Sequence, residues 1–247
     1  MKRATFTLML ALCLGITGSA LAQNVTDDTK LAAKFRASAD HGVALAQVNL
    51  GAMYMLGQGV ERDEAQAVAW FRKAADQGDA AGQIGLGIMY ANGLGVGQNT
   101  ILAVELYRKA ADRGDIRGQY MLGRMYAYGQ GVSRDDAQAA AWFRKAAQQG
   151  NVTAQVKLGK MYEKGRGVVQ DYAQALAWHR KAADQGNVDA QVTLGMMYLH
   201  GRGVPPDIAQ AATWFREAAQ QGNVTAKETL RMMTAAGLIR HHQSCRQ

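Results

Sequence analysis

The sequence predicts an all-α protein, an α/α superhelical solenoid of about five 36-residue helix-turn-helix repeats with half-repeat caps. Three observations carry this prediction. The nine residues 46–54 recur at 82–90, 118–126, 154–162 and 190–198 with no insertion or deletion. Apolar residues recur at helical spacing twice within each period, and glycines and capping residues punctuate each period at the same points. Stacked repeats of this kind form an extended surface, which favours binding over catalysis.

The first residues are expected to be a cleaved signal peptide over 1–22. A short basic start precedes an uncharged, mostly apolar run over 4–18, and Ala20-Leu21-Ala22 provides the small-residue pattern that signal peptidase reads. A membrane anchor is the alternative interpretation, but the run is shorter than the roughly 20 apolar residues that cross a bilayer. The chain is therefore predicted to be exported, and to be periplasmic or secreted in a Gram-negative-type bacterium, with no transmembrane segment after cleavage.

Composition narrows the class of partner. Loss of Lys2 and Arg3 would lower the net charge from +8 to +6, and Cys245 would be the one remaining cysteine, so no internal disulfide is expected. A basic surface favours anionic partners. We therefore expect a protein partner or an acidic envelope polymer, and no nucleic acid because of the predicted export. The sequence leaves the oligomeric state and the identity of the partner open.

The repeats divide the predicted mature chain into one elongated domain with an atypical segment at each end. A capping helix over 23–45 matches only the second helix of a repeat. The predicted repeats then span 46–81, 82–117, 118–153, 154–189 and 190–225. A C-terminal capping helix and tail over 226–247 match a first helix, in which Arg231 takes the place of a recurrent glycine and Thr234 that of a recurrent tyrosine.

The first repeat illustrates the expected local structure. Its first helix carries an apolar face that includes Leu50 and Met53, and Gly57 is suited to the left-handed conformation that ends a helix. Asp63 is predicted to cap the second helix, whose apolar face includes Trp70. Gly78 and Asp79 then end that helix and begin the next repeat.

Three further sets of residues recur at the repeat spacing. Glycines inside the first helices each cost about 1 kcal/mol relative to alanine, so close approach of a neighbouring helix is predicted there; they are Gly51, Gly87, Gly123, Gly159 and Gly195. Methionines are predicted to fill the core; they are Met53, Met89, Met125, Met161, Met197 and Met233. Arg-Lys pairs are interpreted as a solvated stripe near helix C-termini; they begin at Arg72, Arg108, Arg144 and Arg180.

The pattern A-x-x-x-L-G-x-x-Y-x-x-G-x-G-V, followed by D-x-x-x-A-x-x-W-[FY]-x-K-A-A-x-x-G, resembles the Sel-one-like repeat family, relatives of the tetratricopeptide repeats. The resemblance covers almost all of residues 31–236. It implies a superhelix used as an adaptor or scaffold, and exported bacterial members serve in envelope assembly, signalling and host contact. Some secreted members with paired cysteines have been described as penicillin-binding or β-lactam-hydrolysing, and this chain lacks those cysteines.

The sequence offers little for catalysis, and no catalytic residue, metal ligand or cofactor is predicted. Of its serines after residue 22, Ser38, Ser133 and Ser244, none lies in G-x-S-x-G or S-x-x-K. Cys245 lies near His241 and His242, but a polar tail gives no fixed geometry for a thiol–imidazole pair. His179 replaces a recurrent phenylalanine and is interpreted as a packing residue. A hydrolase acting on cell-wall or β-lactam substrates remains the alternative function.

The candidate site comes from positions that differ between repeats. Positions 4, 7 and 11 of a repeat lie on one side of the first helix. If first helices line a concave groove, as in tetratricopeptide-like stacks, the groove grades from small and apolar to cationic along the chain. The predicted partner-binding residues are Arg124, Tyr128, Lys157, Lys160, Lys164, Met196 and His200. The leading expectation is a non-enzymatic scaffold that binds a protein segment or acidic polymer there; ordinary exposed residues without a role are the alternative.

Overall fold

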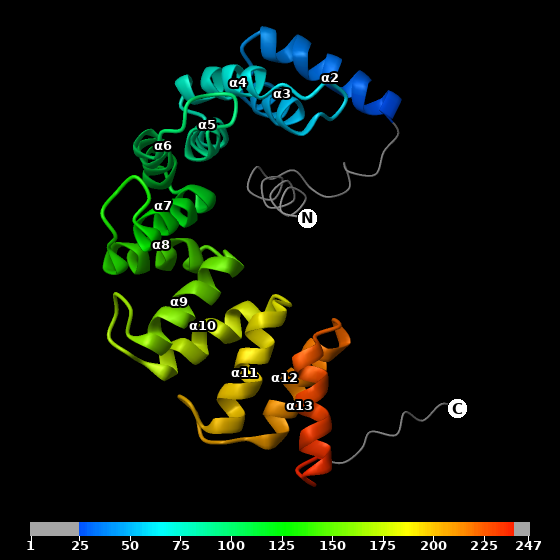
Figure 1. Ribbon diagram of the computed structural model, residues 1–247, viewed down its shortest axis with the longest axis vertical. Helices are drawn as coiled ribbons and strands as arrows, with labels where there is room; N and C mark the ends of the chain where they lie inside the picture. The colour runs from blue at the N-terminus through cyan, green and yellow to red at the C-terminus, as the bar shows by residue number, and fades with distance from the viewer. Residues whose placement is uncertain (1–24, 240–247) are drawn as a thin grey trace. The chain divides into compact units, whose positions relative to one another are not determined.

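The computed structural model describes residues 25–239, which form helices α2 to α13 and contain no strand (Figure 1). These residues divide into two compact units, one ending at Asp135 and the other beginning at Asp136. The first unit contains α2 (Val25–Asp40), α3 (Ala44–Leu56), α4 (Glu64–Asp76), α5 (Ala80–Asn92), α6 (Thr100–Asp112) and α7 (Ile116–Tyr128). The second contains α8 (Asp136–Gln148), α9 (Val152–Lys164), α10 (Tyr172–Asp184), α11 (Val188–His200), α12 (Ile208–Gln220) and α13 (Val224–Ala235).

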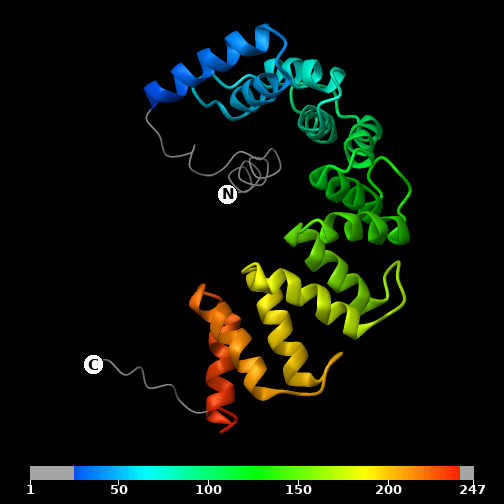
Figure 2. The ribbon, with the colours of Figure 1, turned by 180° about the vertical axis from the view of Figure 1, so that it is seen from behind.

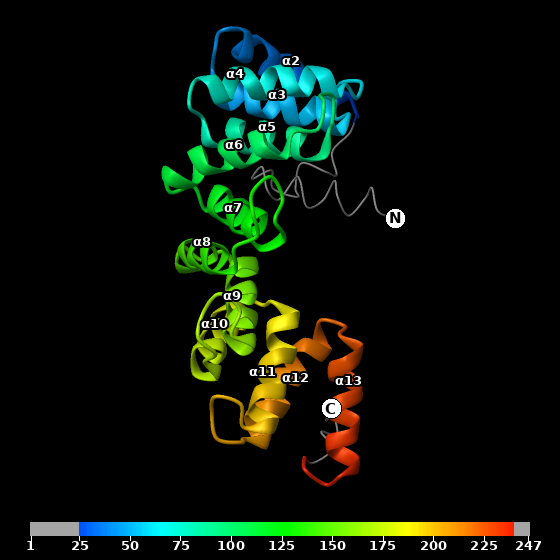
Figure 3. The same ribbon diagram turned by 60° about the vertical axis from the view of Figure 1, so that its left-hand side comes forward.

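The predicted all-α repeat architecture is therefore confirmed. Within each unit, every helix packs against the helix before it and the helix after it in the chain, as Figures 1 and 2 allow the reader to follow from the two sides. In the first unit, the first helices α3 and α5 also contact each other (Figure 3). The predicted signal peptide over 1–22 and the tail residues His241, His242 and Cys245 lie outside the described residues.

The start and stop signals act as predicted. Gly57 has φ 71° and donates its N–H to the carbonyl of Met53 at 2.8 Å, which ends α3. Asp63 then accepts a hydrogen bond from the backbone N–H of Gln66 at 3.0 Å and caps α4. The same side-chain cap begins α6, α10 and α12, at Asn99, Asp171 and Asp207. Because these four loops reuse the same capping bond, their helix pairs repeat with the same boundaries.

The loop between the helices of a pair lies directly on the preceding second helix. A methyl group on Gly59, which has φ 63°, would lie 2.1 Å from the carbonyl oxygen of Asp28 in α2. Gly167 has the same relation to Asp136 in α8, at 2.0 Å. No side chain fits at these distances, so glycine is needed both for its backbone conformation and for the close contact.

Four of the recurrent glycines inside the first helices, Gly51, Gly87, Gly159 and Gly195, provide space for an aromatic ring of the paired helix. A methyl group on Gly51 would lie 3.0 Å from Phe71, and one on Gly195 would lie 2.7 Å from Phe215. Both rings are fully buried. The predicted close approach is thus confirmed, and its partner is a side chain rather than the backbone of the neighbouring helix. The recurrent methionines are also buried, which confirms their place in the core.

Candidate binding surfaces

The recurrent arginines link consecutive repeats. Arg72 donates a hydrogen bond to the Tyr90 hydroxyl at 2.7 Å, and Arg144 donates to the Tyr162 hydroxyl at 2.9 Å. The remaining pairs are Arg108 with Tyr126 and Arg180 with Tyr198. Arg72, Arg108 and Arg180 are exposed, as the predicted solvated stripe requires, but the stripe is not generic, because each arginine is bonded to the next repeat.

The lysines of those pairs also have specific contacts. The Lys73 ammonium lies 3.8 Å from the centroid of the Trp70 ring, within cation–π range. Lys145 lies over Trp142 and Lys181 over Trp178 in the same way. Each lysine thus covers the solvent side of a buried tryptophan, and its charge is not simply displayed on the surface.

Buried glutamines form a second link between repeats, which the sequence analysis missed. Gln47 is 3% exposed; its amide donates to the Ala39 carbonyl at 3.1 Å and its oxygen accepts from Gln77 at 2.7 Å. Gln155 and Gln191 repeat both bonds in the second unit. A polar residue that recurs on an apolar helix face was the available signal, since buried amides are retained where they are hydrogen-bonded.

One glutamine lacks its partner. Gln83 is 4% exposed, and its side-chain oxygen has no hydrogen-bond partner. Arg113 occupies the position that Gln77, Gln185 and Gln221 hold in other repeats, and it donates to the carbonyl of Gly78. A buried acceptor without a donor costs about 1–3 kcal/mol, so this junction is a weak point of the first unit.

Two residues of the predicted site, Arg124 and Tyr128, lie on α7 in the first unit. Arg124 is half-buried, lies 6.0 Å from the Tyr120 ring centroid and approaches the Met121 sulfur at 3.8 Å. Tyr128 is 58% exposed. Arg124 is therefore held against its own helix, and only Tyr128 is openly displayed.

The three predicted lysines lie on α9 in the second unit. Lys160 and Lys164 are exposed, and Lys157 is half-buried. Their spacing of three and four residues places them on one side of the helix. An acidic residue lies near these lysines, because Glu163 is close enough for Lys160 to lower the pKa of its carboxyl group.

Met196 and His200 lie on α11 of the same unit. Both are exposed, Met196 by 40%, and Met196 occupies the same repeat position as Lys160. The next residue in this row, Met232 on α13, is 64% exposed and was not predicted. Helix α10 packs against both α9 and α11, so these residues belong to one compact unit. We call Lys157, Lys160, Lys164, Met196, His200 and Met232 the first-helix surface of the second unit.

The position that Lys160 and Met196 share is closed in the first two repeats of the first unit. Ala52 and Ile88, which correspond to Lys160 and Met196, are only 1% and 2% exposed. They lie on α3 and α5, which contact each other directly. At this position the change in residue type along the chain thus accompanies a change in accessibility, from buried Ala52 and Ile88 to exposed Lys160 and Met196.

Formal charge is also distributed unevenly. Residues 25–135 contain 12 lysines and arginines and 12 acidic residues, so their charges cancel. Residues 136–239 contain 12 basic and 8 acidic residues, which leaves a net charge of +4. Electrostatic attraction of an anionic partner therefore favours the second unit.

A histidine–glutamate pair joins α10 to α9 in the second unit. His179 is fully buried against Gly159, and its Nε2 lies 3.1 Å from Oε1 of Glu163. Pairing with His179 lowers the pKa of Glu163, and Lys160 and Arg202 add to this effect against the opposing influence of burial. The prediction that His179 is a packing residue is confirmed by its burial, whereas its acidic partner was not predicted.

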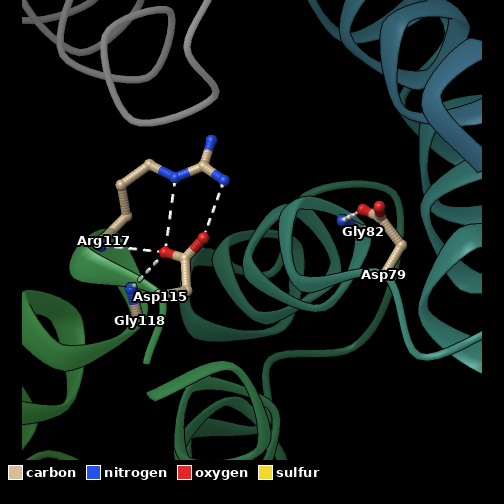
Figure 4. A network of polar contacts seen from close by, with 5 residues as sticks. All are labelled: Asp79, Gly82, Asp115, Arg117 and Gly118. Carbon is tan, nitrogen blue, oxygen red and sulfur yellow. Dashed lines mark hydrogen bonds and ion pairs between the residues drawn. The ribbon is translucent and has the colours of Figure 1, made fainter. Parts of the chain in front are cut away.

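A second perturbed carboxylate caps a helix in the first unit (Figure 4). Asp115 accepts from the backbone N–H groups of Arg117 and Gly118 at 2.8 and 3.0 Å and pairs with the Arg117 guanidinium at 3.0 Å. Burial raises the pKa of Asp115, but these bonds and the arginine charge outweigh it and hold the pKa below its usual value. Asp79, at the equivalent position one repeat earlier, makes the single cap to Gly82. Both residues have a structural role.

Two recesses lie at equivalent places in the first and fourth repeats, beside the loop that joins the helices of a pair. The recess of the first repeat includes Arg36, Tyr54 and Glu61, with a volume of about 670 Å³. The recess of the fourth repeat includes Arg144, Tyr162 and Val169, with a volume of about 510 Å³. In both, the recurrent arginine lies near the recurrent tyrosine, at 5.6 and 6.0 Å from the ring centroid.

Metal binding, nucleophilic catalysis and membrane insertion each have a direct structural requirement. Over residues 25–239, no group of three or more histidine, cysteine or acidic side chains is arranged to hold a metal ion. Ser38 and Ser133 are exposed, on α2 and on the loop before α8. In the same span, none of the helices has the length and apolar character needed to cross a bilayer.

The repeats identify the family. The Sel1 repeat model matches residues 44–79, 80–115, 116–151, 152–187 and 188–223, at the predicted spacing and two residues before the predicted divisions. The chain therefore belongs to the Sel1 repeat family, whose members generally act as protein–protein interaction scaffolds. No curated protein is significantly similar to the chain.

Solved structures agree with this assignment. The chain is similar to c5321, a protective antigen of uropathogenic Escherichia coli with an SLR fold, at 39% identity over 83% of this chain and 44% of that one, with a TM-score of 0.77. A Sel1 repeat protein from Oxalobacter formigenes is 38% identical over 81% of this chain and 58% of that one, with a TM-score of 0.75. This chain thus spans about half the length of those two proteins. A sel1 repeat protein from Klebsiella pneumoniae, at 23% identity over 82% and 99% of the two chains and a TM-score of 0.52, shares the fold.

Proposed function

We propose that the protein is an exported, non-enzymatic adaptor whose first-helix surface of the second unit binds an anionic segment of a partner. Membership of a scaffold family supports the binding role. The observation that carries the choice of surface is the row of lysines on α9, of which Lys160 and Lys164 are exposed. Export is supported by the signal-like sequence of residues 1–22.

Like charges at a spacing of three or four residues repel by a few tenths of a kcal/mol per pair in an isolated helix. Glu163, the one acidic residue on α9, offsets part of this repulsion, and the net charge of +4 on residues 136–239 adds to it. An anionic partner relieves it on binding. Exposed Met196 and Met232 continue the row with flexible apolar side chains, which suit contact with a protein segment better than with a purely polar polymer.

The adaptor role is tested by salt-dependent binding of poly-L-glutamate and of polygalacturonate to the purified chain. The triple variant Lys157→Glu, Lys160→Glu, Lys164→Glu should lose most binding at low salt, and wild-type binding should fall as salt screens the charges. A matched control changes Lys30, Lys34 and Lys109, which are exposed in the first unit, and alters the total charge equally. The control should retain binding.

Equal loss in both triple variants would mean that only total charge matters and would refute the assignment to α9. Two further measurements test the rest of the proposal. Mass spectrometry of the chain expressed in its native host should find a mature N-terminus at Gln23. Sustained, saturable hydrolysis of a chromogenic β-lactam that co-purifies with the protein would refute the non-enzymatic role.

A further inference from the structure

We propose that the recess of the fourth repeat is a second docking site, which accepts a polypeptide segment with an aliphatic side chain beside a carboxylate. The proposal does not depend on the first-helix surface. It joins three features of this recess: exposed apolar side chains, one arginine with donors for a ligand, and a loop that is already held in place.

The apolar wall is formed by Tyr162, Val168 and Val169. Val169 is 88% exposed, more than any other large apolar residue among those described. Tyr172, beside the loop, is 37% exposed. An aliphatic side chain that entered the recess would cover Val169 and remove apolar surface from water, which is the main favourable contribution to such contacts.

The charge in the recess favours a carboxylate. Arg144 is bonded to the Tyr162 hydroxyl by one N–H, and a guanidinium has five such donors. The only acid lining the recess is Asp171, whose carboxylate already caps α10 by accepting from Gln174. Asp171 is thus engaged within its own helix, whereas Arg144 keeps N–H donors with which to bind a ligand carboxylate.

The recess of the first repeat provides the contrast within the same chain. Glu61 stands where Val169 stands, Arg62 where Gln170 stands, and Asp40 also lines the recess. Together with Arg36 and Asp63, these residues give two basic and three acidic groups. The recess of the fourth repeat has one basic and one acidic group, so it lacks this acidic excess and carries an exposed valine in place of Glu61. It therefore suits an aliphatic and anionic ligand better than the recess of the first repeat.

The loop that carries Val169 is pre-formed. The Gln170 amide donates to the carbonyl of Glu163 at 2.7 Å and to the Tyr172 hydroxyl at 3.1 Å. Gly167 lies directly on α8, and Asp171 accepts the first hydrogen bond of α10. A ligand would therefore meet a wall that needs little ordering, which lowers the cost of binding.

The test uses the full chain with ¹³C-labelled valine methyl groups, titrated with the acetylated and amidated tetrapeptide Asp-Leu-Asp-Leu. The methyl signals of Val168 and Val169 should shift in a saturable way. Val169→Glu, which copies the first repeat, and Arg144→Gln should each weaken binding roughly tenfold. The first variant loses an apolar contact and the second a hydrogen bond to a charged group, and either loss has about this effect on affinity. Arg36→Gln in the first repeat is the matched control and should leave binding unchanged.

Two control peptides separate the parts of the proposal. Asn-Leu-Asn-Leu lacks the carboxylates and Asp-Ser-Asp-Ser lacks the aliphatic side chains, so both should bind much more weakly. Equal shifts with either peptide, no shift at Val168 and Val169, or unchanged affinity in Val169→Glu would each overturn the proposal. The lysine triple variant of α9 should bind the tetrapeptide like wild type, so this result stands apart from the proposed function.

Discussion

Substitution of Gly159 by leucine tests the packing of a buried ring against a first helix. A methyl group alone at Gly159 would lie 2.7 Å from Cε1 and Nε2 of His179, closer than any ordinary contact between heavy atoms. The imidazole is fully buried and is paired with Glu163, so it cannot turn aside without loss. Overpacking of a core costs about 1–3 kcal/mol, and the upper end applies because the rest of the leucine must also be accommodated.

Leucine also gains about 0.8 kcal/mol of helix propensity over glycine, so the net loss should be about 2 kcal/mol. For a chain of this size, that loss lowers the Tm by roughly 4–8 °C in thermal unfolding followed by circular dichroism. Gly97→Leu is the control, because a methyl group there meets no atom within 4 Å, and its effect should stay within about 0.5 kcal/mol.

A second substitution identifies the cause. His179→Ala empties the space that the leucine needs, so Gly159→Leu should be much less destabilising in that background, or even stabilising. A double-mutant cycle measures this coupling directly. An unchanged Tm for Gly159→Leu, or the same loss of stability with and without His179, would show that the leucine side chain and the imidazole do not occupy the same space.

Three further substitutions have defined outcomes. Arg113→Gln should raise the free energy of unfolding by about 1 kcal/mol in urea titrations, because a glutamine at the equivalent place in another repeat bonds both the carbonyl and the buried amide, and Gln83 lacks that donor. The lowered pKa of Asp115 means that its contribution to stability is present above the unfolded-state pKa and disappears as the pH falls through the folded-state pKa. Asp115→Asn should therefore reduce the loss of Tm between pH 5 and pH 2 in thermal scans, and an unchanged pH profile would contradict this. Tyr162→Phe should cost about 1–3 kcal/mol, and an equally large cost in an Arg144→Ala background would show that the two do not interact.

The sequence predicted those features that depend on one helix pair. Caps, helix ends and the small residues beneath aromatic rings recur at fixed positions, and each leaves a local mark such as Gly57 or Asp63. Local rules of backbone conformation and capping are enough to interpret such marks. The helix pairs and their order were therefore accessible without any structure.

The contacts between repeats were not predicted. Arg144 and Tyr162 are 18 residues apart, and Gln155 and Gln185 are 30 apart, so neither pair lies on one helix face. Their recurrence was visible, but a recurrent charged or polar residue has the same pattern whether it faces water or a neighbour. Ile88 is buried and Lys160 is exposed, although they occupy the same repeat position. Exposure at this position also depends on contacts with neighbouring repeats, so it could not be predicted from the sequence of one repeat.

The bonds between repeats have a consequence for how the chain can change in length. Each arginine finds its tyrosine in the following repeat, so deletion of residues 80–115 as one block would bring Arg72 to the place of Arg108, opposite Tyr126. Removal of a whole period thus leaves complementary surfaces on the two sides of the cut, whereas removal of half a period does not. Gain or loss of one whole repeat in the gene therefore preserves the arginine–tyrosine bond at the new junction. The number of repeats can then change during evolution without loss of this contact.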